Sequence, residues 1–199
     1  MLTSEAEAPD LTFRAERAAV AAALTAFCDT YLCDAPGAVG AAIRYSLLGE
    51  GKRLRAVLVN AAYAATGGAG DVSALAAAVE VVHAYSLVHD DLPCMDDDDM
   101  RRGRPTTHIV YGVPIATAAG LAMVPLAART AAAAARDLGL DVASTGAIVR
   151  ELMGAAGGAG MIGGQLLDLE GEGRPLALAD LERIHPIRRC DRAGIPDCG

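Results

Sequence analysis

The sequence predicts an all-α fold, and its composition and its apolar spacing carry that prediction. Hydrophobic residues make up 53% of the 199 residues, aromatic residues make up only 4%, and alanine dominates. Alanine is the best helix former, and an unbroken run such as residues 131–135 makes a poor strand. Apolar residues recur at the three-, four- and seven-residue steps of one helix face, as at Phe13, Val20, Leu24, Phe27 and Tyr31. The length suits one domain with a sizeable core.

Breaks in this pattern divide the first half of the chain into expected helices. The first helix ends before Pro36, and the second ends at Gly49. A third helix begins at the N-cap signal of residues 71–73 and runs to Asp90. Pro93 ends it, because proline lacks a donor and disfavours helical geometry at the residue before it. The turn that Pro93 makes could bring Asp96 back beside Asp90.

The second half of the chain is expected to be helical as well. No Asp, Glu, Lys or Arg lies between Arg104 and Arg129, a stretch long enough to cross a bilayer. Its prolines, glycines and threonines weaken the apolar transfer energy, so a buried core helix is expected instead. Residues 141–170 carry another helical pattern, with several glycines inside it.

Residues 158–163 match the spacing of a dinucleotide-binding fingerprint, which would indicate an oxidoreductase. No β-branched strand precedes this match, and no strand–helix–strand pattern occurs anywhere in the chain. We therefore interpret these glycines as small residues at a close approach of two helices.

Charge and cysteine content exclude other classes of protein. The net charge of −8 argues against a nucleic-acid partner, which calls for a basic surface. Five irregularly spaced cysteines suit reduced thiols in the cytoplasm better than a disulfide framework. The first ten residues are acidic and lack an apolar core, so we expect neither a signal peptide nor a membrane anchor.

The strongest chemical signal is an aspartate-rich stretch at the end of the third helix. Six aspartates fall between residues 90 and 99, and three arginines follow directly, at positions 101, 102 and 104. Carboxylates suit Mg²⁺, which binds through a few carboxylates and phosphate oxygens, and arginine forks match phosphate. This order predicts a metal–diphosphate site. A solvated acidic loop is the alternative, and an EF-hand is excluded because its residue order is missing.

Three segments resemble the trans-isoprenyl diphosphate synthases, the polyprenyl synthetase family. DDLPCMD followed by DDDMRRGRPTTH (residues 90–108) resembles the first aspartate-rich motif in its bacterial form. GKRLR (residues 51–55) resembles the family's GGKRLRP segment, although Glu50 replaces a glycine and Ala56 a proline. GGQLLDL (residues 163–169) resembles GGQxxDL, in which the glutamine and the aspartate face the active cavity. The resemblance covers residues 11–185 and implies the isoprenoid-synthase type of helical bundle.

The resemblance also implies a set of site residues. Asp90 and Asp96 would hold Mg²⁺, and Arg101 and Gln165 would contact the allylic diphosphate. The homoallylic diphosphate would be bound by four residues: Lys52, Arg55, His83 and Arg102. Tyr85, five residues before Asp90, would set the floor of the product tunnel, and an aromatic residue there is typical of farnesyl-forming members.

The function so implied is condensation of isopentenyl diphosphate with dimethylallyl or geranyl diphosphate to give farnesyl diphosphate, in a homodimer. Two alternatives stay open: a geranylgeranyl-forming enzyme, and a non-catalytic chain that binds diphosphate. Residues 1–185 would be the N-terminal part of one domain, and residues 186–199 an unrelated tail, from a frameshift or disordered. No two acids are adjacent after Asp99. The bundle is therefore expected to be incomplete at its C-terminus, and the chain to be inactive, for want of the second aspartate-rich motif.

Overall fold

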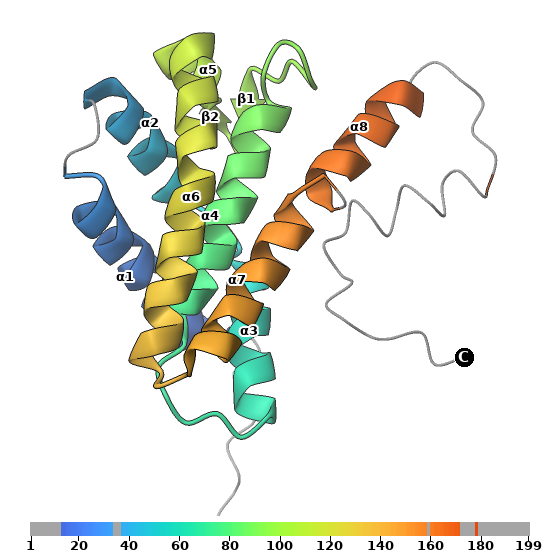
Figure 1. Cartoon of the computed structure of the whole chain (residues 1–199). Coiled ribbons are helices and arrows are strands. Elements are labelled where there is room, and N and C mark those ends of the chain that lie inside the picture. Colours follow the sequence, from blue (N-terminus) through green and yellow to red (C-terminus); the bar gives the residue numbers. More distant parts are fainter. Residues whose placement is uncertain (1–12, 34–36, 159, 172–177, 179–199) are drawn as a thin grey trace, which may run out of the picture.

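The computed structural model describes residues 13–33, 37–158, 160–171 and 178, and most of these residues are helical (Figure 1). The all-α prediction is confirmed. The expectations for the tail at residues 186–199 lie outside the described residues. In order, the elements are α1 Arg14–Tyr31, α2 Gly37–Leu47, α3 Leu54–Ala65, α4 Ser73–Asp90, β1 Met100–Arg101, β2 Arg104–Pro105, α5 Thr107–Tyr111, α6 Val113–Asp137, α7 Val142–Ala156 and α8 Met161–Gly171.

Helix α4 is the centre of the bundle. It lies alongside α6 over most of its length and also contacts α1, α2 and α3 (Figure 1). Its buried residues point in several directions around the helix axis: Ala76, Ala77, Ala78, Val81, Val82, Ala84, Tyr85 and Val88. A helix that is apolar on every side belongs in a core. The other helices therefore hold α4 in place, and its C-terminal end carries the aspartates.

Both ends of α4 agree with the sequence prediction. At its start, Asp71 Oδ1 accepts a hydrogen bond from the backbone N–H of Ser73 at 2.9 Å. At its end, the last helical residue is Asp90, three residues before Pro93. A turn follows, in which the backbone N–H of Asp96 donates to the carbonyl of Asp90 at 2.8 Å. The chain therefore folds back on itself at the aspartates, as the position of Pro93 indicated.

Helix α6 is long and apolar enough to cross a membrane, judged by length and composition alone. In the fold it contacts α2, α4, α5 and α7. Its inward side is made of small residues and one methionine, all fully buried: Ala116, Ala119, Met123, Ala127 and Ala131. Small residues let two helix backbones approach closely, which explains the wide contact between α4 and α6. The expected buried core helix is met in part: these residues face the core, whereas Val113 and Leu121 on the same helix are exposed.

The expected helix over residues 141–170 is divided into two. Helix α7 ends at Ala156 and α8 begins at Met161, with a turn between them in which Gly160 N–H donates to the Gly157 carbonyl at 3.0 Å. A Cβ on Gly160 would collide with the carbonyl group of Ala155. The glycines therefore serve a sharp turn between consecutive helices, and the interpretation as a helix–helix contact was wrong.

The structure supports the exclusion of a dinucleotide-binding fold. In the described part of the chain, the one sheet is the antiparallel pair β1 and β2, with Met100 opposite Pro105 and Arg101 opposite Arg104. A dinucleotide fold needs a parallel sheet with the glycine-rich turn between a strand and a helix. Here the glycine-rich turn lies between two helices.

Candidate active site

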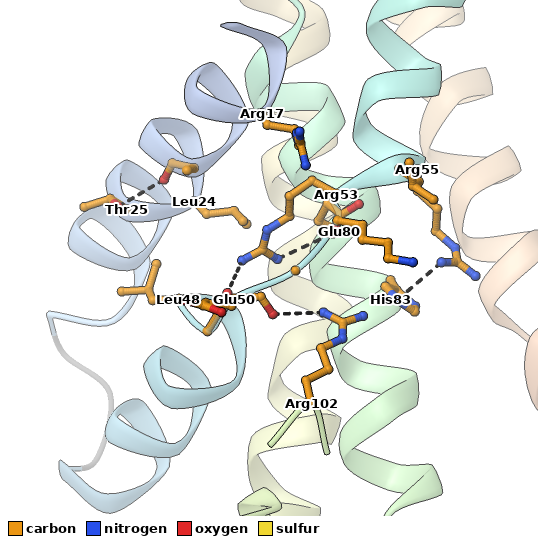
Figure 2. A pocket seen from close by; sticks show the side chains of 15 residues that line it. Arg17, Leu24, Thr25, Leu48, Glu50, Arg53, Arg55, Glu80, His83 and Arg102 are labelled. Carbon is orange, nitrogen blue, oxygen red and sulfur yellow. Dashed lines mark hydrogen bonds and ion pairs between the residues drawn. The ribbon is translucent and has the colours of Figure 1, made fainter. Parts of the chain in front are cut away.

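A pocket of about 900 Å³ opens beside the middle of α4 (Figure 2). Its walls come from α1, the segment between α2 and α3, the start of α3, α4 and the hairpin formed by β1 and β2. Five cationic side chains line it: Arg17, Lys52, Arg53, Arg55 and Arg102. Two carboxylates, Glu50 and Glu80, stand against them. The excess of positive charge suits a small polyanion in a protein whose net charge is −8.

The basic segment reaches this pocket through a sharp change of direction before α3. Arg53 precedes the helix with φ of 51°, in the left-handed region that residues with a side chain seldom adopt. Its Nη2 donates to the carbonyls of Leu47 and Gly49, at 2.7 Å each. Arg53 is thus bonded to its own backbone surroundings, whereas Lys52 and Arg55 on either side of it are exposed on the pocket wall.

His83 lies on the α4 wall of the pocket. Its Nε2 is 3.3 Å from Nη1 of Arg55, and since the guanidinium can only donate, Nε2 accepts and Nδ1 carries the proton. The pKa of His83 is lowered from 6.5 to about 4, first by burial and then by the charges of Arg55, Arg102, Arg101 and Arg53, in that order. The ring is therefore neutral near pH 7.

The hairpin carries Arg102 to the same pocket. Arg102 has φ of 53°, and its Nη1 donates to the carbonyl of Glu50 at 3.2 Å. Two contacts hold the hairpin on α2: the Arg104 guanidinium lies 4.3 Å from the centre of the Tyr45 ring, and the Tyr45 hydroxyl donates to the Pro105 carbonyl at 2.7 Å. A cation over an aromatic ring and a hydroxyl bond together fix the hairpin's orientation. Lys52, Arg55, His83 and Arg102, predicted to act together, therefore share one pocket.

The aspartate end of α4 forms a second group. The bond from Asp96 N–H to the Asp90 carbonyl brings these two residues together. From α8, the side-chain amide of Gln165 donates to Asp96 Oδ1 at 3.5 Å. Among the described residues, no three histidine, cysteine or acidic side chains converge as a ready-made metal cage. Two carboxylates are nevertheless a fitting donor set for Mg²⁺, which keeps several waters and takes its other ligands from phosphate.

Sequence reasoning missed the role of Asp91. Its carboxylate is 5% exposed, and its Oδ1 accepts from Arg101 Nε at 2.5 Å. Burial raises the pKa of Asp91, and the bond to Arg101 partly offsets this. Arg101, predicted as a diphosphate ligand, is also 3.4 Å from Asp98. The carboxylates on either side of it therefore restrict the directions in which Arg101 can point. The sequence did offer a signal for the burial of Asp91. This residue directly precedes Leu92, an apolar residue that is buried in the turn after α4.

Tyr85 is buried one turn before the aspartates. It is 5% exposed, and its ring meets the edge of the His89 ring with the centres 5.0 Å apart. His89 Nε2 donates to the Thr117 carbonyl of α6 at 3.2 Å. This ring lies so close to α6 that a Cβ on Gly120 would collide with it. Tyr85 and His89 therefore lie where α4 approaches α6, and the tunnel floor at Tyr85 stays a prediction.

Comparison with known proteins places this arrangement in a family. The family profile of polyprenyl synthetases matches residues 37–185. Farnesyl diphosphate synthase of Bacillus subtilis is 42% identical over 153 residues, which are 76% of this chain and 51% of that protein. The large subunit 1 of the heterodimeric geranylgeranyl pyrophosphate synthase of Arabidopsis thaliana is 46% identical over 151 residues, 72% of this chain and 40% of that protein.

The fold agrees with the sequence matches. The crystal structure of an FPP/GFPP synthase from Zymomonas mobilis superposes with a TM-score of 0.80 at 30% identity, covering 89% of this chain and 65% of that one. The chain spans about half the length of the curated relatives it matches. Profile, relatives and fold all agree, and the chain belongs to the polyprenyl synthetase family.

Proposed function

We propose that the protein of which this chain is a part is a Mg²⁺-dependent prenyltransferase that joins isopentenyl diphosphate to an allylic diphosphate. The observation that supports this most strongly is the basic pocket beside α4, next to the end that carries Asp90 and Asp96. The basic pocket suits a diphosphate held by cationic side chains, and the aspartates suit a diphosphate held through a metal ion. Two neighbouring diphosphate sites of different kinds are what such a reaction requires.

The basic pocket is the proposed site of the homoallylic substrate. Lys52 and Arg55 supply charge from the segment before α3, and Arg102 supplies it from the hairpin. His83 stands 3.3 Å from Arg55 and adds its Nδ1 proton as a neutral donor. Several donors from separate elements can surround one diphosphate, which orients the double bond of isopentenyl diphosphate toward the other substrate.

The aspartate group is the proposed site of the allylic substrate. Asp90 and Asp96 would hold Mg²⁺, which when bound would neutralise the diphosphate that leaves. Arg101, held by Asp91, would donate to the same diphosphate, and Gln165 on α8 would orient it together with Asp96. These side chains place charge where it develops as the carbon–oxygen bond breaks.

We further propose farnesyl diphosphate as the product, formed by a cytoplasmic homodimer. The buried ring of Tyr85 supports the shorter product, because a bulky side chain five residues before Asp90 would block a growing chain. The similarity to the Arabidopsis subunit supports a geranylgeranyl-forming enzyme as the second candidate. A third candidate is binding of diphosphate without turnover.

Binding and turnover of the 199-residue chain test these proposals separately. We expect calorimetry to show binding of inorganic pyrophosphate, which Arg55→Ala weakens and Arg136→Ala, in the last turn of α6, leaves unchanged. Turnover of radiolabelled isopentenyl diphosphate with geranyl diphosphate and Mg²⁺ is expected to be low, since no two acidic residues are adjacent after Asp99 to form a second aspartate-rich motif. Absence of pyrophosphate binding would overturn the proposed function, and rapid turnover would overturn the expectation of low activity.

A further inference from the structure

One carboxylate in the basic pocket has a position that its charge alone does not explain. Glu80 on α4 is 3% exposed, and it faces the cations that we propose to bind an anion. A buried negative charge in such a place weakens anion binding through space and is costly to desolvate. The geometry of Glu80 offers a role that could outweigh these two costs.

The two oxygens of Glu80 contact two separate groups, one of which is the Arg53 guanidinium seen in Figure 2. Oε1 accepts from the backbone N–H of Ala56 at 3.2 Å. Ala56 is the third residue of α3, and the first four N–H groups of a helix have no acceptor within it. Glu80 therefore acts as a cap supplied by a neighbouring helix, at the end where a negative charge is favoured by the helix dipole.

The other oxygen, Oε2, lies 3.5 Å from Nη1 of Arg53, with both side chains largely buried. The opposite side of this guanidinium donates to the carbonyls of Leu47 and Gly49. Glu80 thus fixes Arg53, and Arg53 fixes the end of α2. The three elements α2, α3 and α4 are joined through two side chains.

The cations of the pocket depend on this connection for their positions. Lys52 and Arg55 flank Arg53, whose left-handed backbone determines the direction in which α3 begins. His83 is three residues after Glu80, on the same face of α4, and meets Arg55 across the pocket. A shift of the Arg53 turn would move Lys52 and Arg55 relative to His83 and Arg102.

We propose that Glu80, acting through Arg53 and the Ala56 amide, is the positioning residue that sets the basic segment at the spacing required by a diphosphate. This inference rests on the proposed function, because it assigns the pocket a diphosphate ligand. Glu80 itself does not contact the ligand. Its effect is to hold Lys52 and Arg55 in the bound arrangement before the anion arrives, which lowers the ordering cost of binding.

The deciding experiment measures the affinity of the full chain for inorganic pyrophosphate, by calorimetry, before and after Glu80→Gln. Charge acting through space predicts tighter binding once the carboxylate is removed. The positioning role predicts the reverse, a loss of about tenfold or more, the effect of losing hydrogen bonds to a charged group. The matched control is Asp29→Asn, the same chemical change at an exposed carboxylate that pairs with Arg44, and it is expected to leave the affinity unchanged.

The positioning role can also be tested if the Glu80→Gln chain fails to fold. One further test uses a second variant, and another uses the unsubstituted chain. Arg53→Lys keeps the charge but cannot reach two carbonyls and a carboxylate at once, so it is expected to show the same loss with unchanged circular dichroism. In the unsubstituted chain, the Ala56 amide is expected to exchange its hydrogen slowly, although it lies in the first turn of α3.

The outcomes separate this inference from the function on which it rests. Equal or tighter binding by Glu80→Gln or by Arg53→Lys, in a chain that binds pyrophosphate before substitution, would overturn the positioning role alone. Rapid exchange of the Ala56 amide would do the same. An unsubstituted chain that does not bind pyrophosphate would overturn the proposed function and this inference with it.

Discussion

Asp91 Oδ1 accepts a hydrogen bond from Arg101 Nε, and this contact joins the end of α4 to the hairpin. Asp91 is the second of the six aspartates, and it is buried, whereas Asp97, Asp98 and Asp99 near the end of the run are exposed. Aspartates of the same run therefore differ in their exposure and in their contacts. Each aspartate can be tested by the same replacement, which makes the run a set of internal controls.

The first prediction concerns the stability of this contact. Asp91→Asn is expected to lower the free energy of unfolding by about 1–3 kcal/mol, because it removes the nearer and buried of the two charged partners of Arg101. Asp98→Asn removes a longer, exposed partner of the same arginine and is expected to cost less than about 1 kcal/mol. Urea unfolding followed by circular dichroism measures both, and equal losses would contradict the assignment.

The second prediction concerns metal-dependent binding. Asp90→Asn and Asp96→Asn are expected to weaken the binding of a non-hydrolysable diphosphate analogue in the presence of Mg²⁺, since each would remove a ligand from a shared metal–phosphate site. Asp98→Asn is expected to have little effect, because a solvated carboxylate contributes little. Titration at fixed Mg²⁺ measures this difference. The same affinity in all three variants would mean that the run is a charged loop.

The third prediction concerns the length of the product. In the complete enzyme, the main product is expected to have fifteen carbons, and Tyr85→Ala is expected to lengthen it by opening the space now filled by the buried ring. Tyr85→Phe keeps the ring and is the matched control, with an unchanged product. Chromatography of the dephosphorylated alcohols gives the distribution. A main product of twenty carbons without any substitution would refute the role given to Tyr85.

The fourth prediction concerns pH. Because the pKa of His83 is lowered to about 4, the folded chain stays unprotonated at this ring while the unfolded chain gains a proton below pH 6.5. Stability is therefore expected to fall as the pH drops from 6.5 to about 4, by up to about 3 kcal/mol, and to be unaffected by this group above pH 6.5. Unfolding curves at a series of pH values, compared with those of His83→Gln, isolate the contribution. A parallel decline in the variant would assign it to other groups.

The sequence was most informative where local chemistry decides the structure. The start of α4 at Ser73 and its end before Pro93 follow from an N-cap signal and a missing donor, which act within a few residues. The gathering of Lys52, Arg55, His83 and Arg102 was implied by the resemblance to a family, and no local rule would have produced it.

Sequence reasoning was least informative where contacts between residues far apart in the chain determine the position of a side chain. Nothing near Arg53 shows that it binds its own backbone while the cations on either side of it stay on the pocket wall. Glu80 left a signal that could have been used, a single acid within the apolar pattern of residues 76–88. The turn between α7 and α8 was misread because a glycine-rich helix contact and a glycine-rich break have the same composition.

The contact between His89 and Gly120 has a consequence for engineering this protein. Replacing glycine by alanine inside a helix ordinarily stabilises it by up to about 1 kcal/mol, and Gly120 lies within the longest helix of the described chain. Here the added methyl group would push the His89 ring away from Thr117, and His89 is directly followed by the first aspartate. Gly120→Ala is therefore expected to displace His89, and with it the backbone at Asp90, so that the usual stabilisation of the helix is lost at this position.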